Sequence, residues 1–124
     1  MVSAGRGEAG GFVGLPWVVE QLERAAGFRP FPGTLNLKLR DEASLARWRR
    51  IRRVPGFLLE PADPSFCSAA VHPVTLPEGI AAVVVVPHVP SYPEDLVEII
   101  AADRLRDRLG LRDGDEVVVW FSEA

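Results

Sequence analysis

The chain has 124 residues, with 14 basic and 17 acidic side chains, and a formal net charge of −3 at pH 7. This length predicts a single domain spanning residues 1–124, large enough to bury roughly two-thirds of its unfolded surface. One cysteine excludes an internal disulfide, and together with two histidines it cannot complete a four-ligand zinc site. The longest apolar run, Ile80 to Val86, has seven residues, whereas a membrane helix needs about 20.

The charge balance and the opening residues also bear on location and partners. No basic segment followed by an apolar segment opens the chain, so we expect no secretion signal, no membrane partner and a cytoplasmic location. The slight acidity disfavours a nucleic-acid partner, and we expect a monomer. The densest basic cluster, Arg47 to Arg53, is interpreted as the solvated face of a helix that Trp48 anchors.

The first half of the chain predicts a helix, a strand and a second helix. A glycine-rich segment, residues 1–14, precedes a helix from Pro16, whose apolar residues recur at helical spacing and which ends at Gly27. Strict alternation from Thr34 to Arg40 predicts a strand, with three leucines on one face. Asp41 to Arg50 is expected to be a short helix that Asp41 caps.

The second half predicts short strands separated by prolines. The strand-length pieces are Gly56–Glu60, Phe66–Val74, Gly79–Val86, Leu96–Ile100 and Glu116–Phe121. Ala102 to Leu109 predicts a helix that Gly110 ends. About six strands and two or three short helices, without regular βαβ alternation, favour a mainly β fold built as a small closed barrel.

The segment Gly5 to Gly10 satisfies the pattern G-x-G-x-x-G. A dinucleotide fingerprint needs a strand before the glycines and a helix directly after them, and only Met1 to Ala4 precede this segment. The Rossmann interpretation therefore fails. Two interpretations stay open: a glycine loop whose amides approach phosphate groups, or an N-terminal tail without a ligand.

Thr34 and Asn36 are the candidate metal ligands. Strand alternation places the Thr34 hydroxyl and the Asn36 amide oxygen on one face, two residues apart. Both are neutral oxygen ligands of the kind that Mg²⁺ accepts beside phosphates and water. The alternative is that they form the polar face of an amphipathic strand.

Two further segments carry charge near apolar surroundings. Glu98 stands between Val97 and Ile99 in an apolar strand, so it lies either at an exposed edge or beside a partner. Asp103 to Arg106 is expected to begin the last helix, where free amides and two guanidinium groups suit an anion. The alternative for this segment is a solvated helix face with i,i+3 charge pairs.

Four stretches carry a family resemblance: Gly5–Ala9, Gly27–Leu37, Val97–Ala101 followed by Leu105-Arg106, and Asp113–Asp115. In this order, over nearly the whole chain, they resemble the archaeal-type CTP-dependent riboflavin kinases. The resemblance implies a six-stranded cradle-loop barrel, similar to riboflavin synthase. It also implies Mg²⁺-assisted transfer of the γ-phosphate of CTP to the ribityl 5′-hydroxyl of riboflavin, which yields FMN and CDP. Such chemistry depends on positioning and charge more than on a nucleophile, and the sequence offers none.

The resemblance also assigns roles to residues of this chain. Thr34 and Asn36 would hold Mg²⁺, and Ser91 and Glu98 would contact the flavin. Glu98 is in addition a candidate acceptor of the 5′-hydroxyl proton. The residues implied for the nucleotide are Arg6, Gly7, Glu8, Ala9, Gly10 and Gly11 in the glycine loop, and Asp103, Arg104, Leu105 and Arg106 further on.

Two other functions remain open at this stage. One is a barrel that binds flavin or nucleotide without turnover. The other is a DNA-binding regulator with a swapped-hairpin barrel, because the segment from Ile99 to Val118 is similar to those short domains. The acidic balance, the glycine loop and the G-T-L-N stretch argue against the regulator.

Overall fold

The computed structural model describes residues 2–3, 15–31, 34–53, 56–61, 68–88 and 92–121. Seven described strands form one sheet in which every pair is antiparallel, in the order β1-β2-β6-β5-β4-β3, with β7 also paired to β4. The elements are β1 (Val2–Ser3), α2 (Pro16–Ala26), β2 (Leu35–Lys38), α3 (Glu42–Arg53), β3 (Phe57–Leu59), β4 (Ala69–Leu76), the 3-10 turn η1 (Pro77–Gly79), β5 (Ile80–Pro87), β6 (Leu96–Ala101), α4 (Leu105–Arg108) and β7 (Trp120–Phe121). The mainly β prediction with few short helices is confirmed.

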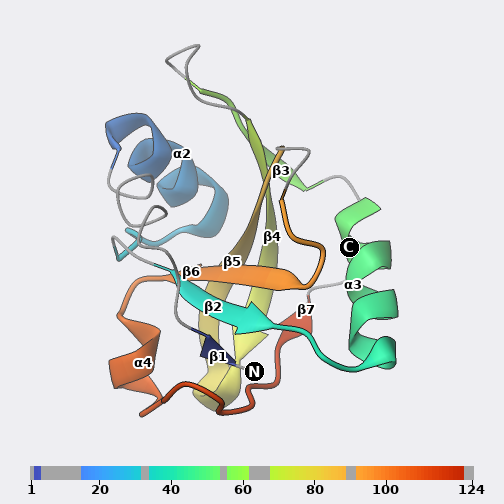
Figure 1. Cartoon of the computed structure of the whole chain (residues 1–124). Coiled ribbons are helices and arrows are strands. Elements are labelled where there is room, and N and C mark those ends of the chain that lie inside the picture. The colour runs from blue at the N-terminus through green and yellow to red at the C-terminus, as the bar shows by residue number, and fades with distance from the viewer. Residues whose placement is uncertain are drawn as a thin grey trace.

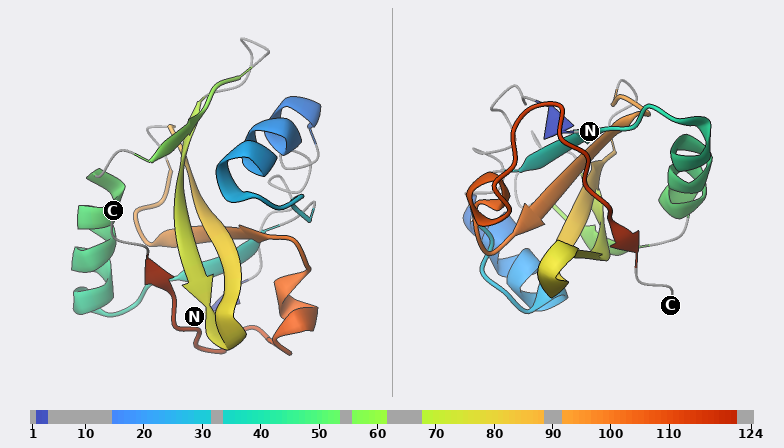
Figure 2. Two further views of the ribbon diagram at one scale, coloured as in Figure 1. Left: turned by 180° about the vertical axis from the view of Figure 1, so that it is seen from behind. Right: turned by 90° about the horizontal axis from the view of Figure 1, so that it is seen from below.

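The sheet curls so that its strands run in two directions. Figure 1 shows β2 and β6 crossing the long hairpin of β4 and β5, while α2 and α3 lie on opposite sides of that hairpin. The two views of Figure 2 show the same separation of α2 from α3. Within the described segments, no helix is long and apolar enough to cross a membrane.

The central strand β5 is buried on both of its faces. Val84 belongs to a cluster with Trp48 of α3, whereas Val83 and Val85 pack with Val18 of α2. Because each face is covered, the apolar run does not alternate with polar residues, as an exposed antiparallel strand would. Fully burying one valine side chain contributes about 1.5–3 kcal/mol to folding stability. The two clusters share such buried side chains between helix and sheet, so they hold α2 and α3 against the sheet.

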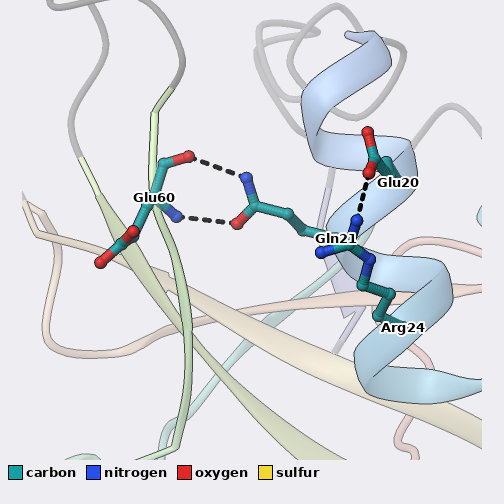
Figure 3. A network of polar contacts seen from close by, with 4 residues as sticks. All are labelled: Glu20, Gln21, Arg24 and Glu60. Atoms are coloured by element: carbon teal, nitrogen blue, oxygen red, sulfur yellow. Dashed lines mark hydrogen bonds and ion pairs between the residues drawn. The ribbon is translucent and has the colours of Figure 1, made fainter.

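Helix α2 begins and ends where the sequence predicts. Pro16 is in its first turn, and Gly27 caps it in the left-handed conformation, with φ of 80°. The Gly27 N–H donates to the Glu23 carbonyl at 2.9 Å. Gln21 fastens the helix to the end of β3: its amide donates to the Glu60 carbonyl and accepts from the Glu60 N–H, both at 2.8 Å (Figure 3). Glu20 and Arg24 form an ion pair on the exposed side of the same helix.

Helix α3 is capped and anchored as predicted. The Ser44 N–H donates to the Asp41 carboxylate at 2.9 Å. Hydrogen bonding by the Ser44 side chain, and then by this N–H, lowers the pKa of Asp41. Trp48 is 2% exposed and its ring lies 5.7 Å from that of Phe121. The helix continues to Arg53, three residues beyond the predicted end at Arg50. Its arginine side chains are exposed or half-buried on the surface.

Two predicted elements are shorter in the structure. The last strand was expected over Glu116–Phe121, but only Trp120 and Phe121 pair, opposite Thr75 and Val74. Burial still alternates from residue 116 onward, yet no described strand pairs with residues 116–119, so the pattern is present without a ladder. The last helix begins at Leu105 rather than Ala102, because β6 continues through Ala101 and the chain then turns.

Pro73 lies inside β4, where a proline removes one backbone donor. On its outer edge, β4 pairs with β3 through Val71 and with β7 from Val74 onward. Pro73 therefore stands in the gap between these two short strands, where this edge of β4 has no described partner, while its other edge pairs with Val83 of β5. The proline is tolerated because that edge needs no ladder bond at this point.

Candidate active site

The polar side chains of β2 and β6 meet on one face of the sheet. The register pairs Leu35 with Ile99 and Asn36 with Glu98, so the leucine and isoleucine point into the core while the polar pair points away. The Thr34 hydroxyl donates to the Asn36 amide oxygen at 2.9 Å. It also lies 3.5 Å from Oε2 of Glu98. Alternation places Thr34 and Asn36 together as expected, and their metal-binding role stays a prediction.

Glu98 has a second partner that the sequence analysis missed. The Tyr92 hydroxyl donates to Oε1 of Glu98 at 2.6 Å, a short bond of the kind made to an ionised acceptor. Burial raises the pKa of Tyr92, and the bond to Glu98 and its charge raise it further, while Arg52 acts in the opposite direction. The phenol therefore stays protonated and continues to donate. The only sequence signal was its place as the chain's single tyrosine, just before β6.

A cavity of about 240 Å³ adjoins this cluster. Thr34 belongs to both, because its side chain contacts Asn36 and Glu98 and it also lines the cavity. The Phe31 N–H donates to the Ala101 carbonyl at 2.8 Å, which holds the segment before β2 against the end of β6. The cavity is lined by Phe31, Thr34, Leu35, Ile99, Ala101, Asp103, Arg104, Leu105 and Arg106.

The structure brings the whole segment Asp103 to Arg106 to this cavity. The prediction that Asp103 begins the helix is wrong, since α4 starts at Leu105 and has four residues. Arg104 is paired with Asp107 at 3.0 Å, an i,i+3 contact of the kind that the alternative interpretation expected. Arg106 is paired with Asp113 at 2.6 Å. Leu105 is 4% exposed and packs in the core.

Other predicted site residues lie outside the described residues. These are Ser91 and the glycine-loop residues Arg6, Gly7, Glu8, Ala9, Gly10 and Gly11. A larger cavity of about 400 Å³ lies between α3 and residues 116–121, and none of the predicted site residues lines it. The cluster of Thr34, Asn36, Glu98 and Tyr92, with the adjoining cavity, is therefore the candidate active site.

Comparison with known proteins agrees with the resemblance. Residues 2–120 match the family described as CTP-dep_RFKase, domain of unknown function DUF120. The chain belongs to this family. Its relatives include proteins named riboflavin kinase from Methanosarcina mazei, Methanosarcina acetivorans and Saccharolobus solfataricus. The Methanosarcina mazei protein is 42% identical over 98% of this chain, and the Methanosarcina acetivorans protein is 39% identical over 94%. The Saccharolobus solfataricus protein is 31% identical over 95% of this chain.

The relatives differ from this chain in length. The matched region covers 55% of the Methanosarcina mazei protein, 50% of the Methanosarcina acetivorans protein and 69% of the Saccharolobus solfataricus protein. The chain thus spans about half the length of the first two relatives. The family match nonetheless includes every described residue of the candidate site.

Proposed function

We propose that this chain is a CTP-dependent riboflavin kinase, which transfers the γ-phosphoryl group of CTP to the ribityl 5′-hydroxyl of riboflavin and releases FMN and CDP. The observation that carries the proposal is the contact of Thr34 with both Asn36 and Glu98 beside a cavity, in a member of this family. Phosphoryl transfer needs groups that position two substrates and balance charge, and the cluster and the cavity provide two adjacent places for them.

The residues at the cluster fit a magnesium ion. The Thr34 hydroxyl lies within 2.9 Å of the Asn36 amide oxygen and 3.5 Å of Glu98, which gives an oxygen-only set with one carboxylate. Mg²⁺ prefers such ligands and is commonly held by few protein groups beside substrate phosphates. Thr34 and Asn36 would hold the ion. When bound, Mg²⁺ neutralises charge on the phosphate oxygens.

The remaining residues divide between the two substrates. Asp103 to Arg106 would hold the nucleotide at the cavity, together with the glycine loop from Arg6 to Gly11. Arg104 and Arg106 already carry acidic partners, so a phosphate group would compete with Asp107 and Asp113 for them. Glu98 and Ser91 would contact riboflavin. Glu98 would also act as the base that accepts the 5′-hydroxyl proton, because its carboxylate lies beside Thr34 in the cluster.

The proposal also includes a six-stranded cradle-loop barrel, which the resemblance implies. Single-domain organisation over residues 1–124, a monomeric state and a cytoplasmic location are proposed with it, as expected from the sequence. Nucleic acid is not among its proposed partners. The curled antiparallel sheet supports the barrel, and the net charge of −3 supports the absence of a nucleic-acid partner.

The test is to incubate the protein with riboflavin, Mg²⁺ and each of the four nucleoside triphosphates, and to follow FMN by chromatography. We expect FMN with CTP and less with ATP. Binding of riboflavin or CTP without FMN would instead indicate a non-catalytic flavin- or nucleotide-binding barrel. Tight duplex DNA binding without FMN would indicate the regulator.

A further inference from the structure

The two oxygens of the Glu98 carboxylate have different surroundings. Oε1 accepts the 2.6 Å bond from the Tyr92 hydroxyl. Oε2 faces the Thr34 hydroxyl at 3.5 Å, on the side of Asn36. A hydroxyl carries one proton, and the shorter bond from Thr34 to Asn36 uses it, so Oε2 keeps its capacity to accept from another donor.

The phenol that holds Oε1 stands on a segment fastened at several points. The Leu39 N–H donates to the Asp95 carbonyl at 2.8 Å, which joins the segment to the end of β2. Lys38 pairs with Asp95 at 3.8 Å, and Arg49 of α3 pairs with Glu94 at 3.5 Å. Each exposed pair contributes little alone, but together with the backbone bond they tie the chain after Tyr92 to two elements.

A carboxylate on a flexible side chain needs such a restraint. The terminal torsion of a glutamate is broad, so without a fixed donor the two oxygens of Glu98 would exchange positions freely. The Tyr92 hydroxyl donates to one of them. It stays protonated at neutral pH, because burial and then the neighbouring carboxylate raise its pKa. As a result, Oε1 accepts the bond from Tyr92, and Oε2 faces the Thr34–Asn36 pair.

We infer that Tyr92 is a positioning residue, which holds Glu98 so that Oε2 receives the acceptor hydroxyl of the substrate. This inference rests on the proposed function. In the reaction, the ribityl oxygen forms a bond to the γ-phosphorus, and the bond from that phosphorus to the β,γ-bridging oxygen breaks. The bridging oxygen leaves with CDP, and the hydroxyl proton passes to Oε2. Tyr92 touches neither substrate in this scheme and acts through Glu98.

The kinetic test is a double-mutant cycle between Tyr92→Phe and Glu98→Ala. Tyr92→Phe removes a single oxygen, and we expect kcat to fall about tenfold, or about 1.4 kcal/mol, while the KM for CTP changes less than twofold. In the Glu98→Ala background the same change should alter kcat less than twofold, because the carboxylate that the Tyr92 hydroxyl bonds is gone. Independent, multiplicative losses in the two backgrounds would overturn the inference.

A matched control separates positioning from general loss of structure. Ser68 and His88 form a side-chain hydrogen bond of 2.8 Å at the surface, whereas the bond between Tyr92 and Glu98 is half-buried. Ser68→Ala removes that bond away from the cluster, and we expect kcat within twofold of the unmodified protein. An equal loss of kcat in Ser68→Ala and Tyr92→Phe would also overturn the inference.

A second measurement does not depend on turnover. Tyr92 is the only tyrosine in the chain, so growth with 3-fluorotyrosine labels this position alone. The fluorine resonance should shift when Glu98→Ala removes the acceptor, and it should respond to riboflavin only when Glu98 is present. A resonance that Glu98→Ala leaves unchanged would overturn the inference. If the protein forms no FMN, the proposed function fails, and this signal still decides whether Tyr92 holds Glu98.

Discussion

Asn36 and Glu98 are register partners across the β2–β6 pair, and Thr34 lies within reach of both. Their strands are separated in sequence by α3 and the β3–β5 segment. Antiparallel pairing brings directly opposite side chains to Cβ separations of about 4.5–5.5 Å on one face. The amide that we propose binds the metal and the carboxylate that we propose contacts the substrate thus lie side by side. We therefore expect changes to either residue to affect the same reaction step.

Replacing the proposed metal ligands should reduce turnover without unfolding the protein. We expect Thr34→Val and Asn36→Leu each to lower Mg²⁺-dependent FMN formation tenfold or more, on the order of 1.4 kcal/mol. Both replacements suit extended backbone, so the thermal midpoint should change little. Thr75→Val is the matched control, since Thr75 is an exposed strand threonine on β4. Full activity in the Thr34→Val, Asn36→Leu double variant would exclude the metal assignment.

Glu98→Gln keeps the shape of the side chain and removes its charge. We expect weaker riboflavin binding and a larger loss in turnover than in CTP affinity, because the amide oxygen accepts a hydrogen bond but takes up no proton. Riboflavin fluorescence measures the affinity, and initial rates of FMN formation measure turnover. Glu42→Gln, a change at an exposed carboxylate in the first turn of α3, should leave both unaltered. Equal affinity and turnover in Glu98→Gln would remove Glu98 from the site.

Gly56 should not tolerate a side chain, because the chain passes close to β4 at this position. A Cβ there would overlap the carbonyl oxygen of Val71 and lie 3.0 Å from the ring of His72. Overpacking of this kind typically costs about 1–3 kcal/mol. Urea unfolding of Gly56→Ala should therefore show a lower midpoint with an unchanged slope. A midpoint equal to that of the unmodified protein would show that the strands separate easily here.

His72 should make the folded state less stable in mild acid. The ring is 6% exposed, and burial lowers its pKa below the ordinary 6.5. Between the two pKa values the unfolded chain binds more protons at this residue than the folded protein does. The free energy of unfolding is therefore undiminished by this residue above pH 6.5, and it falls as the pH drops towards the folded-state pKa. Unfolding at pH 7.5 and 5.0 should show less pH dependence in His72→Leu. His88→Gln, at the exposed second histidine, should keep the pH dependence of the unmodified protein. Equal pH dependence in the unmodified protein and both variants would show that His72 does not cause it.

The arginines of α3 should not form a nucleic-acid site. Arg47, Arg50 and Arg53 are exposed, but Arg49 pairs with Glu94 and the chain carries a net charge of −3. At physiological salt we expect duplex DNA to bind no tighter than the nonspecific range of about 10⁻⁴–10⁻⁶ M. Fluorescence anisotropy with a labelled duplex measures this. Tight binding that survives at that ionic strength would favour the regulator.

Local patterns in the sequence determined several elements of this protein. Pro16 and Gly27 mark the ends of α2, Asp41 marks the start of α3, and alternation around Asn36 predicts both β2 and the shared face of its polar side chains. Each of these features depends on residues within a few positions of one another, so the backbone geometry of one helix or strand is sufficient to predict it.

Only the tertiary structure decided which of those elements meet. Residues 116–119 alternate like a strand, yet they have no described partner, because pairing depends on where a distant strand lies. The bond from Tyr92 to Glu98 joins the irregular segment before β6 to that strand, and no periodicity connects the two residues. The candidate site likewise exists because the register of β2 against β6 places Asn36 opposite Glu98, and long-range register arises from packing of the whole core rather than from local propensity.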